Sequence, residues 1–93
     1  MIVAIGSIDL HFPEAHCLKD KRRILKSLID RVRARFNCSI AEVEHMDMWQ
    51  RSLVGVAIVG NDKQLLMQMG QRIEEILQDD ALVRAMSIEW EYC

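Results

Sequence analysis

The residues with the clearest chemical potential are basic and lie close together in one stretch of the chain. Eight of the twelve Lys and Arg residues fall between Lys19 and Arg35. The run Lys19–Arg23 opens this stretch with four basic residues around one aspartate. Such side chains bind phosphate or carboxylate groups, and the free N–H groups of a helix N-terminus add to an anion site. The alternative is a solvated helix face without a ligand.

An RNA-binding surface is the first hypothesis that follows from this pattern. Basic residues in the first turn of a helix oppose its macrodipole, so they are unfavourable for the helix itself, and an incoming phosphate would offset that cost. Contacts of this kind position RNA without reading its sequence. The residues predicted to contact phosphates are Lys19, Lys21, Arg22, Arg23, Lys26 and Arg33.

A second group of residues is predicted to lie at the same end of the fold. The first strand ends where the basic helix begins, and the connection between the second and third strands falls at the same edge. Trp49 in that connection either stacks on a base or plugs the core. The candidate accessory residues are His16, His45, Asp47, Trp49 and Gln50.

Metal and nucleophile chemistry are weaker alternatives for these residues. His16, His45 and Asp47 are an acceptable ligand set for a transition metal. No His-x-x-x-His or Cys-x-x-Cys spacing fixes two ligands on one element, so we expect no metal and no cofactor. Cys17 is a candidate nucleophile near a helix N-terminus, but no third group would orient a histidine. We expect no catalytic residue and no enzymatic activity. Whether His11 approaches the other two histidines is left open.

Length and composition indicate one soluble domain over residues 1–93. The content of 51% hydrophobic and 28% charged residues is ordinary for a globular protein. No apolar run approaches the ~20 residues of a membrane span. The N-terminus lacks the basic region of a signal peptide, so we expect a cytoplasmic protein without a membrane partner. Three widely spaced cysteines indicate free thiols.

The net charge of −2 hides an uneven distribution. Residues 1–37 hold eight basic against four acidic side chains, and residues 38–93 hold four against ten. The near-neutral total therefore does not exclude a surface for nucleic acid.

Hydrophobic periodicity predicts the element order β-α-β-β-α-β. Strands are predicted over residues 2–12, 38–44, 51–59 and 86–92, with helices over 18–36 and 65–77. Asn37 is the expected C-cap of the first helix, and Asp62 is the expected N-cap of the second. The inward residues of the second strand are predicted to be Ala41 and Val43. Those of the last strand are predicted to be Met86, Ile88, Trp90 and Tyr92.

With right-handed crossovers, this order predicts an α+β, ferredoxin-like βαββαβ sandwich. Two helices would cover one face of a four-stranded antiparallel sheet. The opposite face is predicted to carry no aromatic residue for base stacking and several carboxylates, unlike a sheet that binds RNA.

An apolar part of that open face supports a second hypothesis. The residues predicted to gather there are Val3, Ile5, Ile40, Ala57 and Val59. Exposed apolar patches often mark contacts, so this one could close a homodimer that acts as a protein-interaction module without a nucleic-acid role. Cover by a loop or by the C-terminus is the alternative.

Two segments carry a resemblance to a known family. Pro13–Arg23 resembles the "P-x-A-H-S-L-K-[DE]-K-R" segment of the bacterial YlxP-like proteins, and Ala41–Arg51 resembles their "A-E-V-[DE]-x-x-D-x-W-Q-[RK]" segment. The resemblance extends over the whole chain. It implies a ferredoxin-like fold and an uncharacterised function. In many bacteria the family's gene lies among genes for translation initiation and ribosome maturation, which implies RNA or a ribosomal particle as partner.

One position departs from the family pattern. The family commonly has Ser where this chain has Cys17. A hydroxyl there would cap the first helix, and its loss costs about 1 kcal/mol. The resemblance therefore implies that Cys17 is a tolerated cap variant.

Overall fold

Alternating and three-to-four-residue apolar patterns fold into four strands and two helices, which the computed structural model describes over residues 1–93. The elements follow in the order β1 (Ile2–His11), α1 (Leu18–Arg35), β2 (Ser39–Glu44), β3 (Arg51–Gly60), α2 (Lys63–Leu77) and β4 (Arg84–Tyr92). This is the βαββαβ order predicted from the sequence.

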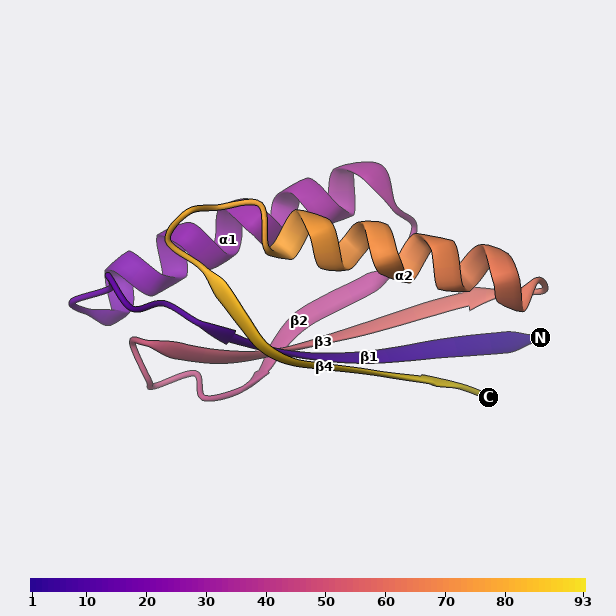
Figure 1. The fold of residues 1–93 in the computed structure, drawn as a ribbon, viewed down its shortest axis with the longest axis horizontal. Coiled ribbons are helices and arrows are strands. Elements are labelled where there is room, and N and C mark those ends of the chain that lie inside the picture. The colour runs from indigo at the N-terminus through magenta and orange to yellow at the C-terminus, as the bar shows by residue number, and fades with distance from the viewer.

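The strands form one sheet with the order β2-β3-β1-β4, in which every neighbouring pair is antiparallel. β1 is central and pairs along its length with β3 and β4. Both helices lie on the same side of the sheet, and no helix covers the other side (Figure 1). The structure confirms the ferredoxin-like sandwich. The face without helices is called the open face below.

The core lies between the sheet and the helices. Inward positions of β1 alternate, as the period of a half-buried strand requires. The fully buried side chains of β1 are Ala4, Ile8 and Leu10, and Phe12, one residue after the strand, is also fully buried. In α1 the buried apolar residues recur at three- and four-residue spacing and face the sheet. They are Leu25, Leu28, Ile29 and Val32.

The helix ends follow local chemistry. Asp62 is the N-cap of α2, as predicted, and its carboxylate accepts hydrogen bonds from two backbone N–H groups of the first turn. α2 begins at Lys63, two residues before the predicted start, and Leu65 in its first turn is 52% exposed. α1 ends one residue earlier than expected, with Phe36 rather than Asn37 as its C-cap. Neither helix combines the length and apolar character needed to cross a membrane.

A bulge changes which residues of β4 face the core. The pairing of β1 with β4 shifts register between Asp9 and Leu10, which face Ser87 and Ala85. Met86, between Ser87 and Ala85, is the extra residue of this bulge and has no partner on β1. It is 65% exposed, so the prediction that it faces inward is wrong. Three later residues remain half-buried against the core as predicted: Ile88, Trp90 and Tyr92.

β2 faces the opposite way from the prediction. Ile40 is buried in the core and Glu42 is partly buried, whereas Ala41 and Val43 are exposed. The prediction followed the small apolar pair Ala41 and Val43. The larger Ile40 is the residue buried, and Glu42 finds a cationic partner beneath α1.

Trp90 connects the sheet to α2. A Cβ atom on Gly6 of β1 would lie 2.6 Å from a ring carbon of Trp90, and one on Gly70 of α2 would lie 3.1 Å from another. The indole N–H donates a hydrogen bond to the Glu74 carboxylate. The two glycines therefore provide the space in which a large aromatic ring packs between the two layers.

We expect Gly6→Ala to lower the free energy of unfolding by about 1–3 kcal/mol, because the new methyl group overlaps the Trp90 ring. Chemical denaturation measures the change. Ser7→Ala, the next position on the open face, is the matched control and should shift it by less than about 0.5 kcal/mol. Gly6→Ala should cost less in a Trp90→Phe background, where the ring is smaller. An equal cost in both backgrounds would rule out this contact as the cause.

Candidate functional site

Lys21 lies beneath α1 rather than on its exposed surface. Its side chain is 0% exposed and continues the apolar stripe one turn before Leu25. The ammonium Nζ donates to Glu42 Oε2 of β2 at 2.9 Å. The prediction that Lys21 contacts RNA phosphates is therefore wrong, because a buried ammonium already paired with a carboxylate cannot reach a polymer.

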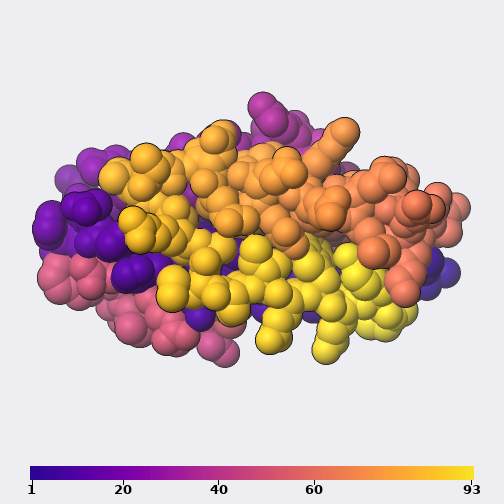
Figure 2. Space-filling model, viewed as in Figure 1, coloured from indigo at the N-terminus to yellow at the C-terminus, as the bar shows by residue number.

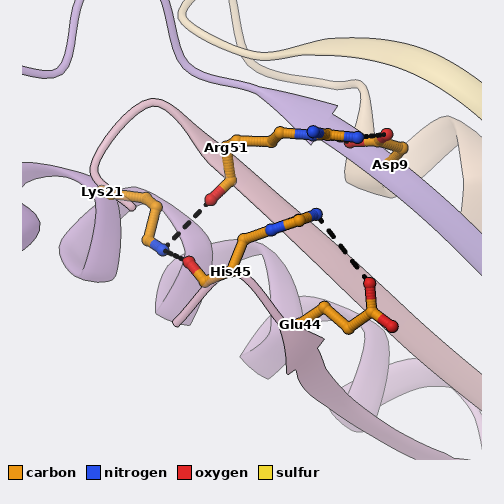
Figure 3. Close-up of polar contacts among 5 residues, drawn as sticks. All are labelled: Asp9, Lys21, Glu44, His45 and Arg51. Atoms are coloured by element: carbon orange, nitrogen blue, oxygen red, sulfur yellow. Dashed lines mark hydrogen bonds and ion pairs between the residues drawn. The ribbon is translucent and has the colours of Figure 1, made fainter. Parts of the chain in front are cut away.

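The same ammonium anchors the connection between β2 and β3 (Figure 3). Nζ lies 2.9 Å from the carbonyl oxygen of His45, 3.2 Å from that of Arg51 and 3.4 Å from that of Met46. Its N–H groups thus meet one carboxylate and carbonyls from both ends of the connection. A buried charge is tolerated only when it is paired and hydrogen-bonded, and this arrangement meets both conditions.

The connection itself, residues 45–50, is tightly folded. His45 has φ of 67°, in the left-handed region, and its carbonyl also accepts a hydrogen bond from Met48 N at 3.0 Å. Gln50 Nε2 lies 3.3 Å from the carbonyl oxygens of both Pro13 and Ala15. The connection is therefore fixed against α1 and against the segment that leads into it. The structure brings together the two segments that the topology placed at one edge.

Four of the predicted phosphate-binding residues lie on the exposed side of α1: Lys19, Arg22, Arg23 and Lys26. Two of them have acidic partners on the same helix. Arg23 Nη2 lies 3.6 Å from Asp20 Oδ1, and Lys26 Nζ lies 2.6 Å from Asp30 Oδ2. Exposed pairs of this kind contribute about 0.3–0.5 kcal/mol to stability. A phosphate could therefore replace the carboxylate in either pair.

Lys19 and Arg22 take part in none of the ion pairs of the structure. Arg33 differs from both, because its Nη2 donates to the Ile40 carbonyl of the edge strand β2 at 2.8 Å. Lys19 and Arg22 are therefore the predicted cations with the least internal competition for a ligand.

The chain supplies its own anion at the N-terminus of α1. Asp20 Oδ2 accepts a hydrogen bond from His16 N at 3.1 Å, and this bond is the main cause that holds the pKa of Asp20 below its usual value. Cys17 is the N-cap and its side chain forms no capping hydrogen bond. The resident carboxylate leaves less of the helix end free for an external anion than the sequence suggested.

Three apolar side chains of the 45–50 connection point into solvent. The exposed fractions are 51% for Met46, 45% for Met48 and 47% for Trp49. Trp49 therefore does not plug the core, which was one of its two predicted roles. Sequence reasoning missed Met46 and Met48. The available signal was three large apolar residues within four positions of a connection.

The histidines do not form a metal centre. No three His, Cys, Asp or Glu side chains are grouped closely enough to hold a metal ion. His45 Nε2 lies 3.9 Å from Glu44 Oε2 (Figure 3). His16 and Asp47 are exposed. No hydrogen bond joins Cys17 to a histidine. The geometry thus gives no support to the metal set or to a thiol–histidine pair.

An ion pair closes the polar end of the open face. Arg51 donates from Nε to Asp9 Oδ1 at 3.2 Å and from Nη2 to Oδ2 at 2.8 Å (Figure 3). These hydrogen bonds lower the pKa of the Asp9 carboxyl. The two charges neutralise each other, so this end offers little net attraction for phosphate.

The remainder of the open face includes an apolar patch. Four of the residues predicted there are in place: Val3, Ile5, Ala57 and Val59. Ile5 is 42% and Val59 is 63% exposed. The prediction that Ile40 belongs to this patch is wrong, because Ile40 lies in the core and cannot contribute to a contact on this face. Ala41 and Val43 of the same strand are exposed instead. These six residues, without Ile40, are called the open-face patch.

We expect Lys21→Met to lower the free energy of unfolding by about 3–5 kcal/mol, because it leaves Glu42 and the carbonyls of the connection without their donor. Lys26→Met, which removes an exposed ion pair, is the matched control and should cost less than about 0.5 kcal/mol. Glu42→Gln added to Lys21→Met should recover part of the loss. Hydrogen exchange of the amides in residues 45–51 should also become faster. Unchanged exchange there would show that Lys21 does not hold the connection.

Comparisons with known proteins agree with this fold and leave activity undefined. The crystal structure of a protein provisionally described as a chlorite dismutase has a TM-score of 0.54 at 9% identity, covering 99% of this chain and 44% of that one. A designed protein with a ferredoxin fold has a TM-score of 0.49 at 18% identity, covering 99% and 85%. The first likeness concerns the fold alone.

Sequence relatives identify the family. The uncharacterized protein YlxP of Bacillus subtilis (strain 168) is 38% identical over 64 residues, which are 69% of this chain and 66% of that protein. A family described as "Protein of unknown function (DUF503)" matches residues 3–90. The chain therefore belongs to this family of YlxP-like proteins, whose function is uncharacterised.

Proposed function

We propose that this protein is a small binding protein without catalytic activity that contacts RNA phosphates through the exposed side of α1. The contacts would come from Lys19, Arg22, Arg23 and Lys26. The observation that carries the proposal is that Lys19 and Arg22 are exposed and have no acidic partner. Because no carboxylate of the chain pairs with these two cations, a phosphate would not have to displace one.

The position of these cations supports the same proposal. They share the exposed start of one helix, and residues 1–37 hold twice as many basic as acidic side chains. The weak pairs of Arg23 and Lys26 can exchange their carboxylates for phosphates at small cost. A ribosomal particle, which the family resemblance implies as a partner, is the first RNA to examine.

We expect the protein to sediment with purified bacterial ribosomal subunits at about 50 mM salt and to be released at about 200 mM, because phosphate contacts release counterions. Lys19→Gln/Arg22→Gln should weaken binding and reduce the slope of log K against log salt by about 1.5. Arg72→Gln/Arg84→Gln, with the same change of charge at exposed sites elsewhere, is the matched control. Equal losses in the two double variants would argue against a surface on α1.

The alternative function is a homodimeric interaction module that uses the open face. The specific observation in its favour is the open-face patch, where Ile5, Val43 and Val59 are between 42% and 63% exposed and no other element of the chain covers them. An exposed cluster of this kind is typical of a contact surface.

We expect Val59→Glu to shift any self-association towards the monomer, because an isolated carboxylate would be buried in the contact. Sedimentation equilibrium measures the change. Met67→Glu introduces the same charge at a residue of α2 that is 47% exposed, and it should leave the association unchanged. A wild-type protein that stays monomeric at high concentration would remove the dimer hypothesis.

A further inference from the structure

The connection between β2 and β3 exposes large apolar side chains at a site that is usually polar. Met46, Met48 and Trp49 are each about half exposed although they lie within four consecutive positions. Apolar surface left in water costs about 25 cal/mol per Å², so folding alone does not favour this arrangement. Exposed apolar side chains on a fixed connection are a feature of binding sites.

The backbone beneath these side chains is held from two directions. Lys21 binds the carbonyls of His45 and Arg51 from inside the fold, and Gln50 binds the segment that precedes α1. A ligand would therefore meet a surface that is already ordered, and it would not bear the entropy of ordering a mobile loop. The buried lysine thus acts as a positioning residue for the exposed side chains.

Cationic residues lie at the same end of the molecule. Gln50, which follows Trp49, donates a hydrogen bond to the carbonyl of Ala15, shortly before α1. Lys21, which binds the connection, lies between Lys19 and Arg22 in the sequence of α1. Figure 2 shows the pink atoms of the connection beside the dark purple atoms of the chain leading into α1. The exposed cations of α1 lie among several carboxylates, those of Glu14, Asp20, Asp30, Glu44 and Asp47. Of the four cations, Lys19 and Arg22 are the two that take part in no ion pair.

We infer that Trp49 stacks on an unpaired base of an RNA whose phosphates contact Lys19 and Arg22. Aromatic side chains beside a cationic surface are the combination that binds single-stranded nucleic acid, because every base offers a face for stacking. A duplex keeps its bases stacked within the helix and cannot use Trp49 in this way. The ligand is therefore single-stranded RNA. This inference rests on the proposed function and narrows it to one class of RNA.

The test uses fluorescein-labelled oligouridylate of about 12 nucleotides, and an RNA duplex of about 12 base pairs, with the intact protein. We expect the single strand to quench tryptophan fluorescence in the wild type and to leave the Trp49→Phe variant unquenched. By anisotropy, Trp49→Ala should weaken binding of the single strand about tenfold or more, while Trp49→Phe retains most of the affinity. Binding of the duplex should be the same in the wild type and in Trp49→Ala.

Two controls separate the possible failures. Met67→Ala removes an apolar side chain of similar exposure from α2 and should leave RNA binding unchanged. If Lys19→Gln/Arg22→Gln weakens binding of the single strand but Trp49→Ala does not, the inference is overturned and the proposed function stands. If neither RNA binds the wild type, the inference is overturned, and the proposed function is then decided by sedimentation with ribosomal subunits. If Trp49→Ala abolishes self-association and leaves RNA binding intact, the connection is a protein contact and the inference is overturned.

Discussion

The structure depends on the burial of one ammonium group, that of Lys21. In water this group is strongly solvated, and within the fold it is compensated by the Glu42 carboxylate and by carbonyls of the connection that follows β2. A buried pair of this kind contributes little net stability compared with apolar packing. Removing one partner, however, strongly destabilises the protein, because the other charge is left buried and unpaired. Its main consequence is geometric, because it permits one arrangement of α1, β2 and the connection.

The same pair determines which residues of β2 are exposed. Glu42 must point under α1 to reach Lys21, and the alternation of the strand then turns Ile40 inward and Ala41 and Val43 outward. The composition of the open-face patch is thus a consequence of a charge interaction on the opposite side of the sheet. On the open face, Val43 covers Gly55. A Cβ atom on Gly55 would lie 3.0 Å from a methyl carbon of Val43.

The sequence was sufficient for the features that depend on repeated patterns. The element order, the antiparallel sheet and the inward face of β1 follow from long alternations in which many residues agree. The sequence was insufficient where a single residue determines the orientation of a strand or the burial of a side chain. β2 has six residues, and its apolar pattern favoured the wrong face because the partner of Glu42 is distant in sequence. The bulge that exposes Met86 has no signal in β4 itself. Lys21 counted as one more surface cation, since a basic run conceals which member is buried.

The basic run at the start of α1 therefore combines two kinds of role. Lys21 holds the core together and Asp20 binds the backbone of the preceding segment, so both serve the fold. Lys19 and Arg22 have no such partner, and the residue-by-residue similarity of the run to the family pattern does not by itself distinguish the two roles. The distinction is one of free energy. A change at Lys21 is expected to act through stability and through the position of the connection, whereas a change at Lys19 or Arg22 breaks no ion pair and is expected to alter stability only through the helix macrodipole.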